Sequence, residues 1–96
     1  MSYELEFKKS ALKEWEKLDA VVKNQFKKKL IQRLENPCVP SAALAGAQDL
    51  YKIKLRKLGY RLVYLVHDKT ITVTVIAVGQ RNKNQVYELA FSRINE

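Results

Sequence analysis

Few of the side chains from which enzymes build reactive or metal-binding sites occur in this sequence. Among its 96 residues there is one cysteine, Cys38, and one histidine, His67. One cysteine excludes an intrachain disulfide, and one cysteine with one histidine supplies too few ligands for a structural zinc site. We expect Cys38 to be a free thiol in a loop, as is usual in the reducing cytosol, and His67 to be an exposed turn residue.

Other absences exclude whole classes of protein. The sequence has no glycine-rich phosphate loop, no dinucleotide-binding fingerprint and no carboxylate cluster spaced for a two-metal nuclease, so we expect neither a cofactor nor a metal. No apolar run approaches the roughly 20 residues that a membrane span requires, and residues 1–9 lack the apolar segment of a signal peptide. These features favour a cytoplasmic protein that does not span a membrane.

Positive charge is what the chain has in excess. It carries 18 lysines and arginines against 10 acidic residues, which gives a net charge of +8 and an isoelectric point near 9.7. Such an excess favours a nucleic acid, an acidic protein or an anionic membrane surface as a partner. The length fits a single domain over residues 1–96.

The charge is most concentrated in residues 51–61, which hold five basic residues and no acidic one. Two sets alternate there: Tyr51, Ile53 and Leu55, and then Lys52, Lys54 and Arg56. Because successive side chains of a strand point to opposite faces, one set can join a core while the other forms a row of cations. Gly59 supplies a turn, so the pattern predicts a β-hairpin that brings Arg61 beside Lys52 and Lys54.

Three tyrosines, Tyr51, Tyr60 and Tyr64, lie among these charges. A cationic face with aromatic rings is what the binding of an anionic, base-bearing polymer requires. The alternative is an ordinary solvated strand face. Like charges on one short hairpin cost stability, and for this reason we favour a functional surface.

Two helices are predicted after a first strand at residues 3–7. Ser10 should cap the first helix, whose apolar positions are Ala11, Leu12, Trp15 and Leu18. Asp19 should cap the second helix. In that helix apolar residues recur every four positions, at Val22, Phe26, Leu30 and Leu34, and Ile31 lies beside them. Trp15 is expected to be a core anchor. Because the helices have almost no linker, they should form an antiparallel helical hairpin.

The second half of the chain predicts a β-meander. Pro37 and Pro40 end the helix, and strands are expected near residues 50–57, 60–67 and 71–78, with Gly79 ending the last one before a helix over 85–94. The order βααβββα predicts a two-layer α+β domain in which the helical hairpin packs on a mainly antiparallel sheet. The first strand should lie beside the last, and the second face is left for the cationic row and the C-terminal helix.

A set of basic residues decorates the second helix: Lys23, Lys27, Lys28, Lys29 and Arg33. A basic amphipathic helix can lie on a membrane or along a phosphate backbone. A solvated helix face is the interpretation that the residues alone favour.

The basic and aromatic residues can cleave RNA without histidine or metal. The candidates are Lys52, Lys54, Arg61, Arg81 and Tyr87. A lysine can remove the 2′-OH proton if neighbouring cations lower its pKa, and an arginine can hold the phosphate bidentately. A base stacked on a tyrosine would be oriented for in-line attack.

Several fragments of the chain occur together in one group of small bacterial proteins. They are Ala11-Leu12-Lys13-Glu14-Trp15 with Lys17-Leu18, Lys27-Lys28-Lys29-Leu30, Leu44 with Gly46, Tyr51-Lys52-Ile53-Lys54-Leu55-Arg56, Gly59-Tyr60-Arg61-Leu62-Val63-Tyr64, Val78-Gly79 with Arg81, and Val86-Tyr87. Together they cover nearly the whole chain, which resembles the RelE-type toxins of bacterial type II toxin–antitoxin pairs, in the RelE/ParE superfamily. The resemblance implies a RelE-like fold, similar to compact microbial ribonucleases, and a metal-independent endoribonuclease that cuts mRNA in the ribosomal A site.

The resemblance also implies a role for each of the five candidates. Lys52 and Lys54 match lysines that activate the 2′-OH, and Arg61 matches the arginine that holds the scissile phosphate and its transition state. Arg81 matches the residue proposed as the general acid, and Tyr87 matches the aromatic residue that stacks on the substrate. All five positions keep the family's residue type.

Partners follow from the same resemblance. They are a cognate antitoxin, which should be acidic and partly disordered until bound, together with mRNA, the ribosome and, through the toxin–antitoxin complex, operator DNA. The side chains that would dock on ribosomal RNA are Lys23, Lys27, Lys28, Lys29 and Arg56. Ala45 and Gln80 depart from basic residues common in the family, which bears on rate and codon preference more than on the type of reaction. The antitoxin is expected to compete with the C-terminal helix.

Two other functions stay open. One is a toxin of the same fold that cleaves nothing, like the gyrase-poisoning ParE group. The other is a nucleic-acid-binding corepressor, in which each lost cation would weaken binding nearly uniformly. The five-residue set favours the nuclease, since a pure binder has no need of that combination.

Overall fold

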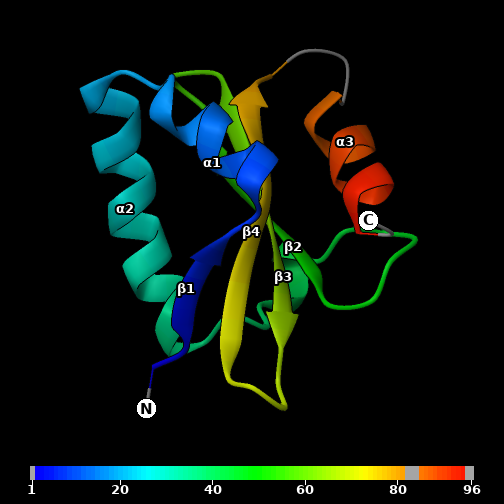
Figure 1. Ribbon diagram of the computed structural model, residues 1–96. Coiled ribbons are helices and arrows are strands. Elements are labelled where there is room, and N and C mark those ends of the chain that lie inside the picture. Colours follow the sequence, from blue (N-terminus) through cyan, green and yellow to red (C-terminus); the bar gives the residue numbers. More distant parts are fainter. Residues whose placement is uncertain (1, 82–84, 95–96) are drawn as a thin grey trace.

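The computed structural model describes residues 2–81 and 85–94, which form a four-stranded sheet with helices on both faces (Figure 1). The strands are β1 (Glu4–Phe7), β2 (Leu50–Leu55), β3 (Tyr60–His67) and β4 (Thr72–Gln80). The helices are α1 (Lys9–Glu16), α2 (Ala20–Glu35) and α3 (Gln85–Arg93), with a short 3-10 turn at Pro40–Ala42. The predicted order βααβββα is therefore confirmed.

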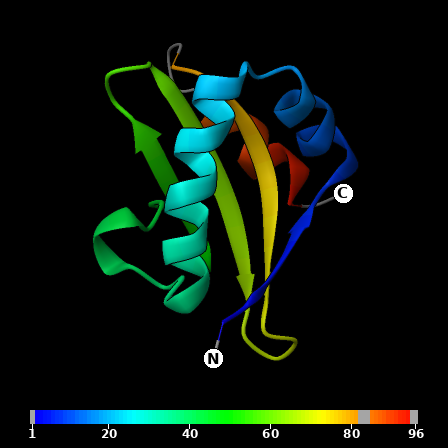
Figure 2. The same cartoon turned by 90° about the vertical axis from the view of Figure 1, so that its left-hand side faces the viewer.

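The sheet has the strand order β1-β4-β3-β2. β1 pairs with β4 in parallel, whereas β4, β3 and β2 pair as an antiparallel meander. The prediction that the first strand lies beside the last is confirmed. Figure 1 shows α2 and α3 on opposite sides of the sheet, and in Figure 2 α2 crosses in front of the strands while α3 lies behind them.

The larger core lies between the sheet and helices α1 and α2. α1 rests on β4 and α2 on β2. Phe26 of α2 is fully buried, and Trp15 packs between it and Phe7, with ring centroids 6.2 and 5.2 Å away. Trp15 is thus the core anchor that its position predicted. Leu12 and Ile31, assigned to the apolar faces of these helices, are instead 42% and 66% exposed.

The two predicted helix caps have different outcomes. Asp19 caps α2 as predicted, because its carboxylate accepts a hydrogen bond from the Val22 backbone N–H at 3.0 Å. The cap at Ser10 is wrong, since α1 begins at Lys9 and its N-cap is Lys8. The Lys8 N–H donates to the carbonyl of Val75 at 3.0 Å, so sheet pairing extends to Lys8 and the helix starts directly after it.

Strand β4 does not end at Gly79, as predicted, but continues to Gln80. The register steps from Val63–Ala77 to Tyr64–Val75, which leaves Ile76 as the extra residue of a β-bulge. The bulge reverses the alternation of side chains along the strand, so the consecutive residues Ile76 and Ala77 both lie on the side of α3, in the core beneath that helix. Gly79 then faces α3, where a Cβ would lie 3.4 Å from Val86, and its small size serves close packing rather than a break.

The prediction that the three hairpin tyrosines lie among the cations is wrong for Tyr51 and Tyr64, which pack on the side of helices α1 and α2. Tyr60 also packs there, but it borders a hollow that four of the cations line. Tyr64 is fully buried and stacks on Tyr51 with centroids 5.8 Å apart. Its hydroxyl donates to the carbonyl of Pro37 at 2.7 Å and accepts from Arg33 at 2.9 Å. These rings share the strand face of Ile53, so the alternation of the strand buries Tyr64 in the core and packs Tyr51 and Tyr60 against it, partly exposed.

Replacing Tyr64 by phenylalanine should lower the free energy of unfolding by about 1–3 kcal/mol, because the Pro37 carbonyl and the Arg33 guanidinium lose a buried partner. Urea denaturation measures the difference. Tyr60→Phe is the matched control, since its hydroxyl accepts only an exposed contact of 3.3 Å from Gln80. Equal stability of the two variants would contradict a structural role for the Tyr64 hydroxyl.

No helix within the described ranges 2–81 and 85–94 combines the length and apolar character that crossing a membrane requires.

Candidate active site

The hairpin of β2 and β3 gathers the predicted cations on the sheet face that carries α3. In its register Lys54 lies opposite Arg61, and Lys52 lies opposite Val63. Ile53 and Leu55, on the other parity, are buried against the helices. The prediction that Arg61 returns beside the two lysines is confirmed.

Tyr87 of α3 reaches over this cationic row. The Arg61 guanidinium donates to the Tyr87 hydroxyl at 3.1 Å, and its central carbon lies 5.2 Å from the centroid of the ring. The Lys52 ammonium lies 5.9 Å from the same centroid. Both cations are within the range of cation–π attraction, so the ring holds them close together.

Arg81 joins the site from the end of β4. Its backbone N–H donates to the carbonyl of Gly59 at 2.6 Å, which ties this segment to the turn of the hairpin. Its exposed side chain borders a hollow of about 250 Å³ that Lys54, Arg56 and Arg61 also line. The five predicted residues therefore lie around one small site, although they come from three strands or their ends and one helix.

Lys54 is the group whose acidity the site changes. The pKa of its ammonium is lowered from the ordinary value of 10.5, first by the charge of Lys52, then by partial burial and by the charges of Arg61, Arg56 and Arg81. A larger fraction of neutral amine is therefore present at Lys54 near neutral pH than at an ordinary lysine. This is the property that a lysine acting as a base requires.

The pKa of Lys54 should move back toward 10.5 when Lys52 is replaced by methionine, because the largest opposing charge is then removed. The direction of the pKa change follows from charge repulsion. Neighbouring cations destabilise the ammonium form of Lys54, so in the wild type it loses its proton at a lower pH than an ordinary lysine. An NMR titration of the lysine side-chain carbons measures the shift. Lys69→Met, at an exposed turn, is the control and should leave the titration unchanged.

The cations assigned to ribosome docking separate into two groups. Lys29 and Arg56 border a shared hollow of about 450 Å³ at the tip of the hairpin, next to Lys54. Lys27 instead borders an apolar hollow on the other side of α2, and Lys28 is exposed along the helix. Lys23 is half-buried on the same helix. The structure thus connects only part of the predicted set to the site.

Arg33 lies in the site region, although the sequence analysis named it only among the basic residues of the second helix and not as a site residue. Its guanidinium donates to the backbone carbonyl of Lys52 at 3.0 Å and to the Tyr64 hydroxyl at 2.9 Å. It also lines a hollow of about 280 Å³ with Lys52, Lys54 and Arg56. Its spacing of four residues from Lys29 placed both on one helix face, a signal that could have identified it.

Residues 2–81 and 85–94 contain no group of three or more His, Cys, Asp or Glu side chains that could hold a metal ion. The chemistry that the described site offers is that of amines, guanidinium groups and the phenol rings of Tyr60 and Tyr87. Such a set can bind a phosphate, stabilise added negative charge on it and stack on a base.

Comparison with known proteins places the chain among bacterial toxins. Residues 5–85 match the family described as the ParE toxin of the type II toxin–antitoxin system parDE. The chain is 51% identical over 94 residues to the mRNA interferase toxin RelE of Escherichia coli strain K12. The matched region covers 98% of this chain and 99% of that protein.

Solved structures agree with the sequence match. A mutant of Escherichia coli toxin RelE in the free state superimposes with a TM-score of 0.90 at 50% identity, over 98% of this chain and 99% of the other. The toxin of the intact Escherichia coli RelBE toxin–antitoxin complex matches with a TM-score of 0.82 at 50% identity, over 85% of this chain and all of the other. The predicted RelE-like α+β fold is confirmed.

Proposed function

The chain belongs to the ParE toxin family of type II toxin–antitoxin systems, and on this premise we propose that it is an endoribonuclease toxin that cuts mRNA in the ribosomal A site. The observation that carries the proposal is the contact of Tyr87 with Arg61 at 3.1 Å, above the row that holds Lys52 and Lys54. A relative 51% identical is named an mRNA interferase, and it spans the same length of chain.

The proposed reaction is attack of a ribose 2′-oxygen on the adjacent phosphorus. The amine of Lys54, or of Lys52 coupled to it, takes the 2′-OH proton, since two interacting lysines titrate as a pair. The bond to the 5′-oxygen breaks, and Arg81 is the proposed donor of the proton that this oxygen needs. A 2′,3′-cyclic phosphate and a free 5′-hydroxyl are the products, and Arg61 stabilises the charge that develops on the phosphate oxygens.

The ribosome has a defined task in this proposal. The described residues of the site include neither an imidazole nor a carboxylate base, so cleavage depends on how well the message is positioned for in-line attack. Docking on ribosomal RNA through Lys29, Arg56 and the other lysines of α2 would supply that positioning and would weaken with salt. The proposed compartment is accordingly the cytoplasm.

A cognate antitoxin is the second proposed partner. A structure 50% identical to this chain is that of a toxin–antitoxin complex, and the net charge of +8 favours an acidic binding partner. Binding of the complex to operator DNA is proposed on the same basis.

Primer extension on an mRNA in a purified translation system tests the function. The wild-type chain should cut within A-site codons, and Arg81→Ala should lower the rate at least about 10²-fold, as expected for loss of an acid group. Lys69→Ala, in the exposed turn after β3, is the control and should cut like the wild type. Equal rates for Arg81→Ala and the wild type would remove Arg81 from the mechanism.

A second candidate function comes from the description of the matched family, which is the ParE toxin. A toxin of this kind would arrest growth without cutting RNA. If the wild type arrests growth while primer extension shows no cuts on translating ribosomes, the nuclease proposal fails, and assays with DNA gyrase are the next step.

A further inference from the structure

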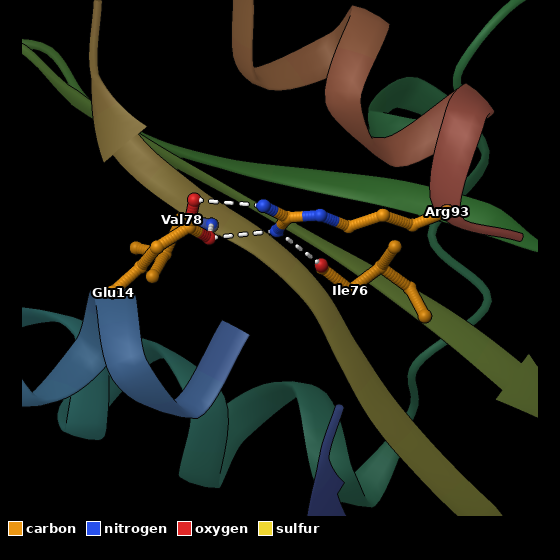
Figure 3. Close-up of polar contacts among 4 residues, drawn as sticks. All are labelled: Glu14, Ile76, Val78 and Arg93. Carbon is orange, nitrogen blue, oxygen red and sulfur yellow. Dashed lines mark hydrogen bonds and ion pairs between the residues drawn. The ribbon is translucent and has the colours of Figure 1, made fainter. Parts of the chain in front are cut away.

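The end of α3 is joined to α1 by an ion pair that passes around the edge of the sheet (Figure 3). The Arg93 guanidinium donates to both carboxylate oxygens of Glu14, at 2.8 and 3.0 Å. Only 13% of the Arg93 side chain and 26% of the Glu14 side chain are exposed. The pair is therefore bidentate and largely shielded from solvent, which is the geometry in which an arginine–carboxylate contact is strongest.

Both partners also bind the backbone of β4. The Arg93 guanidinium donates to the carbonyl of Ile76 at 3.0 Å, and a Glu14 oxygen accepts from the N–H of Val78 at 3.2 Å. The residue pairs of β1 with β4 end at Phe7 and Val75, and the hydrogen bond from the Lys8 N–H to the Val75 carbonyl closes this part of the sheet. Beyond this point the two charged side chains take the place that a longer β1 would occupy, so the sheet edge, α1 and α3 share one polar junction, as Figure 3 shows.

The polar junction holds α3, a helix whose stability depends on its contacts with the rest of the domain. α3 spans only nine residues, and a helix so short does not persist in water by itself. Val86 and Ala90 are its buried residues, and they pack on the smaller core beneath it. Phe91 and Ile94 are partly buried against the same core. The polar contacts of α3 lie near its ends: Tyr87 with Arg61 at one end, and Arg93 with Glu14 at the other.

We propose that Glu14 and Arg93 are positioning residues that dock α3 and thereby hold Tyr87 against Arg61 and Lys52. Neither touches the site hollow. Their effect on the site passes through the helix, because Tyr87 can contact Arg61 only while α3 lies on the sheet. The consequence for cleavage rests on the proposed function, whereas the docking itself does not.

Removing one partner should loosen α3 without unfolding the sheet. A largely buried charge left without its partner opposes docking, and a short helix held by few contacts can detach locally while the rest of the domain stays folded. In Arg93→Met, which keeps the apolar stem, amide hydrogen exchange over residues 86–93 should accelerate at least about tenfold, while exchange in β3 stays unchanged.

Two further variants separate charge from shape. Glu14→Gln keeps an oxygen that can accept a hydrogen bond from Val78 but loses the ionic contact. Arg93→Lys keeps the positive charge but loses the planar guanidinium that donates two parallel hydrogen bonds. Both should fall between the wild type and Arg93→Met in exchange rate. Glu16→Gln, exposed on the same helix α1, is the matched control and should exchange like the wild type.

The NMR signals of the Tyr87 ring and the cleavage kinetics provide the two decisive measurements. In Arg93→Met the ring signals should move toward those of an exposed tyrosine, and kcat should fall at least about tenfold with a smaller change in KM. Arg93→Lys should restore part of both. The double variant Glu14→Gln/Arg93→Met should loosen α3 less than Arg93→Met alone, because it no longer leaves the Glu14 charge without its partner.

Several outcomes would overturn the proposal. One is unchanged exchange and unchanged Tyr87 signals in Arg93→Met and Glu14→Gln. Another is equal acceleration of exchange in β3 and α3, which would make the pair a general stabiliser rather than a docking contact. If the wild type does not cleave mRNA, the proposed function fails, and the exchange and ring measurements then decide the docking role without it.

Discussion

Replacing Arg61 by alanine should lower the rate of mRNA cleavage on translating ribosomes by about 10²–10³-fold, the range found when one stabilising donor is removed from a transition state. Arg61 lies opposite Lys54 in the hairpin and donates to Tyr87, so its guanidinium occupies the centre of the site. A phosphate bound there would receive two parallel hydrogen bonds, whose strength grows as negative charge accumulates on the oxygens.

The comparison of binding with cleavage makes this test specific. Arg61→Ala should weaken binding to ribosomes far less than it slows cutting, because other cations of the surface remain. Arg61→Lys keeps the positive charge but not the planar guanidinium, so it should cut faster than Arg61→Ala and more slowly than the wild type. Proportional losses of binding and cleavage in every variant would instead indicate a surface that only binds nucleic acid.

The second large effect is expected at Tyr87. Tyr87→Ala should lower the rate by about 10–100-fold, which corresponds to losing one stacked base at about 1–3 kcal/mol. Its ring also gathers Arg61 and Lys52, whose charged groups lie 5.2 and 5.9 Å from its centroid. Removing the ring therefore disorders two cations as well as the proposed base platform.

Tyr87→Phe separates the ring from its hydroxyl. The ring stays, and only the hydrogen bond from Arg61 is lost, so this variant should cut faster than Tyr87→Ala. Single-turnover primer extension measures both rates, with Leu89→Ala, at a 39% exposed position of α3, as the control. If Tyr87→Phe and Tyr87→Ala were equally slow, the hydroxyl and not the ring would be the functional group.

The hairpin is the part of the site that could be predicted from sequence. A period of two in hydrophobicity and a glycine at the turn are local properties, and they place Lys52, Lys54 and Arg61 on one face whatever the rest of the chain does. The Asp19 cap is local in the same sense, since its hydrogen bond spans three residues.

Other features depend on contacts between segments far apart in the chain. Ser10 is a suitable cap by type, but the bond of Lys8 to Val75 moves the helix start ahead of it. The bulge at Ile76 follows from the pairing with β3, and it changes which face the end of β4 presents. Tyr64 was expected among the cations, yet it is buried in the core between the sheet and helices α1 and α2.

The sequence by itself thus determined the order of the elements, the cationic face of the hairpin and the family to which the chain belongs, because these depend on short-range periodicity and on fragments read in order. Only the tertiary structure decided that Tyr87 meets Arg61, that Arg33 supports the strand of Lys52, and that Glu14 binds Arg93. These partners are separated by 26, 19 and 79 residues. No local pattern specifies such pairs, since they form only when the sheet brings α1, α2 and α3 to its two faces.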